Sequence, residues 1–191
     1  MNGKTPLMPR VAAPRAGLLV LGLLLLIGCA RSPEAQKARY LERGDQYAAT
    51  EQYREAIIEY ANVLRFDRDN ARATYHLALV QEREGEVRPA ADGYARALAL
   101  SPFDAEVATH LGEAKRKVAV QLGMAGRTAE ARDEMRQAVT LLPDNGEAWL
   151  DLCLLSLDLG DRTAAATALD RARANGASAE RVAFAAAALA R

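Results

Sequence analysis

Two histidines are the residues in this chain whose type and spacing could support chemistry. His76 and His110 are the only histidines, they lie thirty-four residues apart, and each is followed by a leucine. At equivalent places in successive helices, their rings could bind a metal ion together with nearby Glu113, because imidazole and carboxylate are common zinc ligands. The alternative is that both are polar residues of a binding surface. The pattern therefore allows a metal-binding or hydrolytic protein as one hypothesis.

Other catalytic patterns are missing from the sequence. There is no glycine-rich phosphate loop, no GxSxG nucleophile elbow and no HExxH motif. Cys153 is expected to be a small buried packing residue rather than a reactive thiol. The basic run 115–117 (KRK) is expected to form a solvated helix face, or alternatively to meet anionic headgroups or an acidic partner. We therefore expect a protein that is not an enzyme and that uses no cofactor or metal.

A short apolar segment lies near the start of the chain. Lys4, Arg10 and Arg15 form a basic region without acidic residues, and Ala16–Gly28 is then apolar for thirteen residues. A membrane-spanning helix needs about 20 apolar residues, whereas the apolar region of a signal peptide has about 7–15. The segment is therefore typical of a signal peptide. An uncleaved signal anchor, or an ordinary signal peptide that ends near a cysteine, is the alternative.

The end of this segment, Leu26-Ile27-Gly28-Cys29, resembles the lipobox of bacterial lipoproteins. The resemblance implies cleavage before Cys29 and attachment of acyl chains to this residue. One acyl chain binds membranes only marginally, whereas two or more, at about 0.8 kcal/mol per buried CH₂, anchor stably. Ala30 is not the aspartate that retains many such proteins in the inner membrane. The resemblance therefore implies a lipid-anchored protein of the cell envelope, in the outer membrane and facing the periplasm.

Composition limits the remaining possibilities. The chain has 25 basic and 25 acidic residues, and removal of residues 1–28 takes away three basic ones, which leaves a mildly acidic mature chain. A nucleic-acid partner is not indicated, because such binding needs a basic face. With Cys29 lipidated, Cys153 has no partner for an internal disulfide. The alanine- and leucine-rich composition, with few aromatic residues, favours helices throughout.

A repeat of thirty-four residues follows the apolar segment. The matched pairs are Ala56 and Ala90, Tyr60 and Tyr94, and Leu64 and Leu98. This period, with small residues at fixed offsets, resembles the tetratricopeptide repeat, a helix–turn–helix unit. The resemblance implies an all-α solenoid, a right-handed superhelix of about four repeats with a C-terminal capping helix. The predicted boundaries are 1–28 for the signal peptide, 29–36 for the lipidated cysteine and linker, 37–70, 71–104, 105–145 and 146–179 for the repeats, and 180–191 for the capping helix.

The third repeat contains seven extra residues. Seven helical residues turn through nearly two full turns, so their insertion keeps the buried face pointing inward. We therefore expect one lengthened helix from Ala105 to about Met124, close to 30 Å long, which extends beyond its neighbours. The predicted close-packing residues are Gly44, Ala78 and Cys153, and the predicted N-caps are Asn70, Asp104, Asn145 and Ser178.

The resemblance also places a binding groove on the concave surface, formed by the first helix of each repeat. At the corresponding positions the sequence has an apolar track beside charged residues, which suits a partner helix or an extended peptide. The predicted groove residues are Leu41, Arg72, Tyr75, Leu79, Glu82, Leu150 and Leu154. Part of this track could instead pack within the superhelix. The Lys/Asn/Arg carboxylate clamp of chaperone-binding relatives does not appear.

The combined expectation is a membrane-anchored periplasmic scaffold that binds a protein partner. The chain is similar to small tetratricopeptide lipoproteins that accompany pilus assembly, secretion and exopolysaccharide export. A structural subunit of envelope assembly that binds through its convex face is the alternative of a different class.

Overall fold

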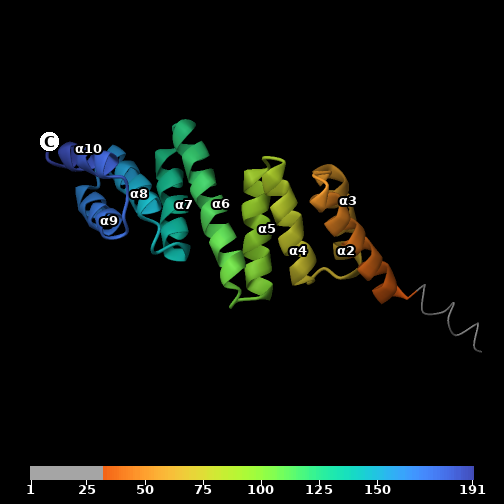
Figure 1. Ribbon diagram of the computed structural model, residues 1–191. Coiled ribbons are helices and arrows are strands. Elements are labelled where there is room, and N and C mark those ends of the chain that lie inside the picture. The colour runs from red at the N-terminus through yellow and green to blue at the C-terminus, as the bar shows by residue number, and fades with distance from the viewer. Residues whose placement is uncertain (1–31) are drawn as a thin grey trace, which may run out of the picture.

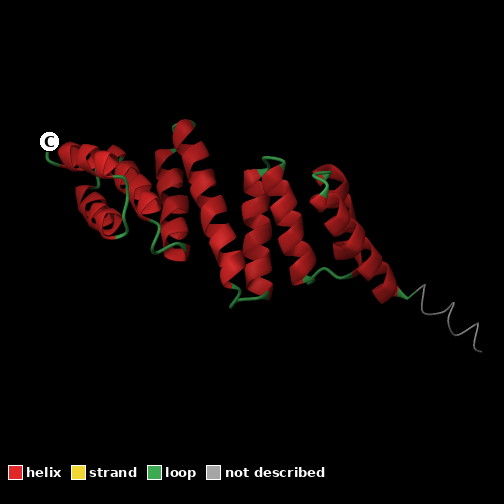
Figure 2. Cartoon of the chain, in the orientation of Figure 1, coloured by secondary structure: helices red, strands yellow, loops and turns green. Residues whose placement is uncertain are grey.

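The computed structural model describes residues 32–191, and every regular element in this part of the chain is an α-helix (Figure 2). The helices are α2 (Pro33–Ala49), α3 (Tyr53–Phe66), α4 (Ala71–Arg83), α5 (Val87–Leu100), α6 (Ala105–Met124), α7 (Thr128–Leu141), α8 (Gly146–Asp158), α9 (Arg162–Ala174) and α10 (Ala179–Leu189). The predicted signal peptide and Cys29 lie outside the described residues. Among residues 32–191, no helix is long and apolar enough to cross a bilayer.

The helices form four antiparallel hairpins that stand side by side in one row (Figure 1). Each helix packs against the next one along the chain, and α10 covers both α8 and α9 at the end of the row. We call the surface formed by the first helix of each hairpin (α2, α4, α6 and α8) the helix-A face. The predicted all-α helical solenoid is therefore confirmed for the described chain.

Asparagine and aspartate side chains fix the starts of three first helices. The side chains of Asn70, Asp104 and Asn145 accept hydrogen bonds from backbone N–H groups of α4, α6 and α8, which satisfies donors that a helix start otherwise leaves without a partner. Ser178 also lies at the N-cap position of α10, as predicted, but without the predicted side-chain bond. Its backbone N–H donates instead to Oε1 of Glu147, 2.7 Å away.

Small residues allow the two helices of a hairpin to approach each other. A Cβ atom on Gly44 would lie 2.6 Å from Cε1 of Tyr60, and one on Gly93 would lie 2.8 Å from Cβ of Ala78. Ala78 and Cys153 are both fully buried. The predicted close-packing role of Gly44, Ala78 and Cys153 is therefore confirmed, because the crossing leaves no room for larger side chains.

Helix α6 has 20 residues, against 13 in α4 and 13 in α8. It carries two buried small residues seven positions apart, Gly112 and Ala119. Gly112 continues the thirty-four-residue series of Gly44 and Ala78, whereas Ala119 lies thirty-four residues before Cys153. The helix therefore packs in the register of the second repeat near its start and in that of the fourth near its end. Its last turns extend beyond α5 (Figure 1), and Met124 there is 85% exposed.

The core is divided along the row. One buried cluster joins α3 and α4, a second joins α4 to α7, and a third joins α6 to α10. The largest fully buried side chains include Tyr60, Tyr94, Met135 and Leu150. This arrangement is typical of repeat proteins, in which each unit packs mainly against its neighbours.

Candidate functional site

The two histidines lie in a run of contacting aromatic rings across α3, α4, α5 and α6. His76 stacks on Tyr60 at a centroid distance of 5.7 Å, and His110 stacks on Tyr94 at 5.4 Å. Tyr75 lies between them, with its ring 5.5 Å from that of His76 and 5.7 Å from that of His110. Each histidine thus packs on the tyrosine sixteen residues earlier, in the second helix of the preceding hairpin.

The tyrosine hydroxyls in this run are held by carboxylates. Tyr60 donates to Asp45, Tyr94 to Glu82 and Tyr75 to Glu106, over 2.8, 2.7 and 2.7 Å. Burial, together with these carboxylates, raises the pKa of all three phenols. Burial also lowers the pKa of His76. The phenols therefore stay protonated as donors, and His76 favours its neutral form.

The metal hypothesis for the histidines is not supported by this geometry. Glu113, the expected third ligand, accepts a hydrogen bond from Asn145 Nδ2 over 3.0 Å, and so points to the loop between α7 and α8. Within residues 32–191, no group of three or more histidine, cysteine, aspartate or glutamate side chains could hold a metal ion. The rings of His76 and His110 act instead as packing surfaces between neighbouring hairpins.

Two adjacent hollows lie on the first half of the helix-A face. The first, about 500 Å³, lies between α2 and α4 and is lined by Leu41, Asp45, Gln46 and Arg72 among others. The second, about 300 Å³, lies where α4 meets α5 and α6, and Arg72 and Tyr75 line it. Arg72 belongs to both hollows, and its side chain is 60% exposed while it pairs with Asp45 over 2.7 Å. The structure thus brings three predicted groove residues, Leu41, Arg72 and Tyr75, around these hollows.

Other predicted groove residues are engaged in packing or pairing. Leu150 is fully buried in the C-terminal core cluster, so its assignment to the groove is corrected. Leu79 is half-buried against the middle cluster. Glu82 accepts hydrogen bonds from Tyr94 and from Lys117; burial alone would raise its pKa, but these two bonds lower it. Glu82 is therefore part of the contact between hairpins and not a free charge in the groove.

The basic run in α6 also makes contacts between helices. Lys115 pairs with Glu134, Arg116 with Asp151 and Lys117 with Glu82, over 3.0, 3.1 and 2.7 Å. Arg181 of α10 pairs in turn with Asp151 and Glu147. The expectation of a solvated face holds only for Lys117, whose side chain is 51% exposed, whereas Lys115 and Arg116 are 17% and 30% exposed. Two of these pairs join α6 to the first helices of the neighbouring hairpins, α4 and α8.

A third hollow, which sequence reasoning missed, lies between the end of α6 and α8. It measures about 250 Å³, and its lining includes Val120, Met124 and the predicted groove residue Leu154, together with Asp151 and Asp158. The seven extra residues of α6 create it, because they extend this helix beyond the start of α5 and place the exposed Met124 at its end. Their number and apolar character are the signal that could have indicated it.

Cys153 is buried in the third cluster, and burial raises the pKa of its thiol. A thiol nucleophile reacts as the thiolate, so both burial and the raised pKa make this residue unreactive. The lipidation site predicted at Cys29 lies outside the described residues.

Comparisons with known proteins agree with this fold. Residues 124–190 match a family model described as tetratricopeptide repeat. A crystal structure of MamA protein is 21% identical, with a TM-score of 0.53 and 73% of each chain covered. A tetratricopeptide repeat protein from Parabacteroides merdae is 18% identical, with a TM-score of 0.55, and 81% of this chain and 59% of that chain covered.

A third structure, of the MamA RS-1 ArsTM double mutant, is 17% identical with a TM-score of 0.52, and the match covers 86% of this chain and 96% of that one. No curated protein matches the sequence. At these identities the solved structures establish the fold alone. The described chain is therefore an all-α helical solenoid of the tetratricopeptide-repeat type.

Proposed function

We propose that this protein is a membrane-anchored scaffold in the periplasm, which binds a protein partner on the helix-A face. The anchor is the lipid on Cys29, supported by the basic region, the short apolar segment and the lipobox-like sequence before it. The repeat fold supports a binding role, because stacked hairpins present an extended surface. The outer membrane is the proposed location, with assembly of an envelope machine for a pilus, for secretion or for exopolysaccharide export as its setting.

The observation that carries the binding proposal is the pair of hollows that share Arg72. Leu41 and Tyr75 give apolar contact in one hollow each, and Arg72 adds an exposed guanidinium between them. Small apolar anchors beside a charged group suit an extended peptide or one face of a helix. A partner segment that crosses from α2 to α6 would fill both hollows and pass over Arg72.

A second candidate surface lies on the other side of the row. A hollow of about 320 Å³ between α7, α8 and α9 is lined by Arg132, Arg136 and Trp149 among others. Nε of Arg132 is the one buried side-chain nitrogen or oxygen in residues 32–191 that has no hydrogen-bond partner. A structural subunit that binds through its convex face would use this hollow.

Photocrosslinking in intact cells distinguishes the two surfaces. A photoreactive amino acid replaces Glu42, which lines the hollow between α2 and α4, or Arg136, which lines the hollow between α7 and α9; both side chains are exposed. We expect a discrete crosslinked partner from position 42 and none from position 136. Crosslinks from position 136 alone would transfer the binding role to the convex face.

A further inference from the structure

The start of α2 is held against one edge of the row. Ser32 is the first described residue, and its Oγ caps α2 by accepting a hydrogen bond from the N–H of Ala35. One turn later Lys37 pairs with Asp67, in the loop after α3, over 3.3 Å. Tyr40 then stacks on Phe66 at a centroid distance of 5.8 Å. The chain therefore enters the fold at a fixed place, beside the connection between the first two hairpins.

This place is close to the proposed lipid. Ser32 is three positions after Cys29, and three extended residues span at most about 10 Å. Antiparallel hairpins put the start of every first helix and the end of every second helix on the same edge of the row. We call this the tether edge. In Figure 2 it is the lower edge, with the loops after α3 and α5 and the entry of the chain.

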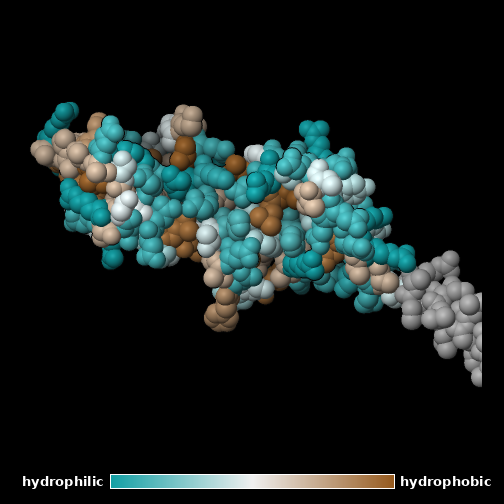
Figure 3. Space-filling view, viewed as in Figure 1, coloured by the Kyte–Doolittle hydropathy of each residue, from teal (hydrophilic) through white to brown (hydrophobic). Residues whose placement is uncertain are grey.

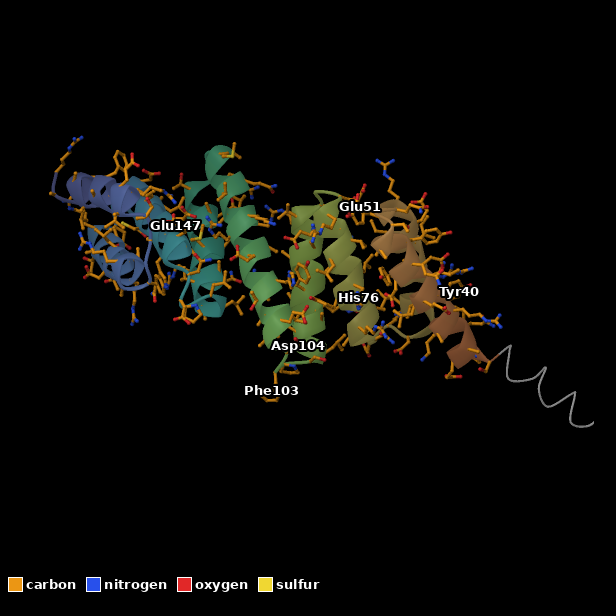
Figure 4. All side chains as sticks on the ribbon, viewed as in Figure 1. Tyr40, Glu51, His76, Phe103, Asp104 and Glu147 are labelled. Atoms are coloured by element: carbon orange, nitrogen blue, oxygen red, sulfur yellow. The ribbon has the colours of Figure 1, made fainter. Side chains whose placement is uncertain are left out.

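Phe103 projects from the tether edge. It lies in the loop between α5 and α6 and is 100% exposed, while the neighbouring Asp104 caps α6. In Figure 4 its side chain points away from the helices, and in Figure 3 an apolar projection stands at the same place among hydrophilic atoms. An aromatic ring that contacts nothing in its own fold contributes nothing to packing. It is available to a surface outside the fold.

Charge does not favour or oppose a lipid surface at this edge. Exposed Arg65, Arg68 and Arg96 are interspersed with exposed Glu34 and Asp69. Attraction to a bilayer must therefore come from the tether and from apolar contact. Aromatic rings suit this role because they concentrate at the boundary between headgroups and acyl chains.

The opposite edge is differently built and farther from the tether. Helices of 13 to 20 residues separate the two edges by about 20–30 Å. Two of the loops there carry exposed Glu51, Glu84 and Glu86. That edge, and the end of α6 with Met124, would then face the periplasm.

We propose that the tether edge lies on the lipid surface and that Phe103 inserts into it as a second, non-covalent contact beside the lipid on Cys29. This inference rests on the anchor of the proposed function. A lipid attached at a single point allows the row of hairpins to rotate relative to the membrane. A ring that inserts at a second point fixes which edge of the row faces the bilayer. The helix-A face then stands upright from the membrane, and the hollow lined by Arg72 and Tyr75 lies near the lipid surface, because Asp104 beside Phe103 also lines it.

The test uses the mature lipidated protein, reconstituted in vesicles of phosphatidylethanolamine and phosphatidylglycerol. Trp149 is the only tryptophan of the chain, so Trp149→Phe combined with Phe103→Trp gives a single fluorescent ring at position 103 and keeps the aromatic contact under test. Trp149→Phe combined with Ala125→Trp, exposed on the opposite edge, is the matched control. With nitroxide-labelled lipid, we expect the tryptophan at position 103 to lose at least about half of its fluorescence, because interfacial groups sit about 5–10 Å into the headgroup boundary. The tryptophan at position 125 should keep its signal.

The outcomes separate this inference from the anchor. A protein that floats with the vesicles but is not quenched at position 103, or is quenched more at position 125, overturns the tether-edge orientation and leaves the anchor intact. A protein that does not float with the vesicles overturns the anchor and the inference with it. Crosslinking of position 103 to an envelope protein in cells, without quenching by lipid, would assign the ring to a protein partner and contradict insertion.

Discussion

Gly44 faces the ring of Tyr60 so closely that a Cβ atom there would lie 2.6 Å from Cε1 and 2.8 Å from Cδ1. The ring cannot move away easily, because it is 1% exposed and its hydroxyl donates to Asp45 over 2.8 Å. The first hairpin, which enters the fold beside the tether, therefore depends on the absence of a single methyl group.

Gly44→Ala should lower the stability of the folded chain. Alanine favours a helix over glycine by about 1 kcal/mol, but overpacking of this crossing should cost about 1–3 kcal/mol, so the melting temperature should fall. Gly123→Ala is the matched control: a Cβ there meets Leu155 at 3.7 Å and Ala131 at 4.0 Å, which are ordinary contacts. Thermal unfolding followed by circular dichroism should show a loss for the first variant and an unchanged or higher melting temperature for the second.

Acid should weaken the fold partly through His76. Burial is the main cause that lowers the pKa of His76, and Arg72 acts in the same direction, while Asp45 and Glu106 act against it. The unfolded chain therefore takes up a proton that the folded chain resists. The contribution of neutral His76 to the stability of the folded chain is fully present above the pKa of about 6.5 that a histidine has in the unfolded chain. It is lost as the pH falls through the lower pKa that His76 has in the folded chain.

His76→Phe keeps a ring on Tyr60 but removes this proton. Its melting temperature should therefore fall less than that of the wild type between about pH 7.5 and pH 5.5, a range centred on the ordinary histidine pKa. The measurement is thermal unfolding at several pH values in this range. Parallel curves for the two proteins would show that His76 does not contribute to the acid sensitivity.

The membrane anchor should depend on one sulfur atom. Cys29→Ser removes the acceptor for the acyl chains, and without them the chain loses its stable attachment to the bilayer. We expect this variant to be lost from the membrane fraction of cells, while wild type stays in it. Equal membrane fractions for both proteins would point to an uncleaved signal anchor.

The order of the helices follows from local signals in the sequence. The period of thirty-four residues places the hairpins. The capping residues Asn70, Asp104 and Asn145 place the starts of their first helices, because each cap acts within one turn of the chain. The repeat pattern also predicts the close-packing positions of Gly44 and Ala78, since a close crossing of two helices leaves no room for a large side chain.

The binding surface follows from the sequence less well. The pattern cannot separate a half-buried apolar residue from a fully buried one, and so it assigns buried Leu150 to the groove beside Leu154, which lines a hollow. It also misses the pairs of Lys117 with Glu82 and Arg116 with Asp151, because each joins residues thirty-five positions apart on different helices. Such pairs depend on how far one hairpin is rotated against the next, which no local signal specifies.

The central claim, binding on the helix-A face, is tested most directly by filling the hollow between α2 and α4. Gln46 lines this hollow and is exposed, so Gln46→Trp should block it without disturbing the core; Arg88→Trp, exposed on the second helix of its hairpin, is the control. The measurement is the Kd for the protein crosslinked from position 42. We predict that Gln46→Trp weakens binding at least about tenfold, or about 1.4 kcal/mol, while Arg88→Trp leaves it near the wild-type value. Unchanged affinity for Gln46→Trp, or loss of binding for Arg88→Trp alone, would contradict the account.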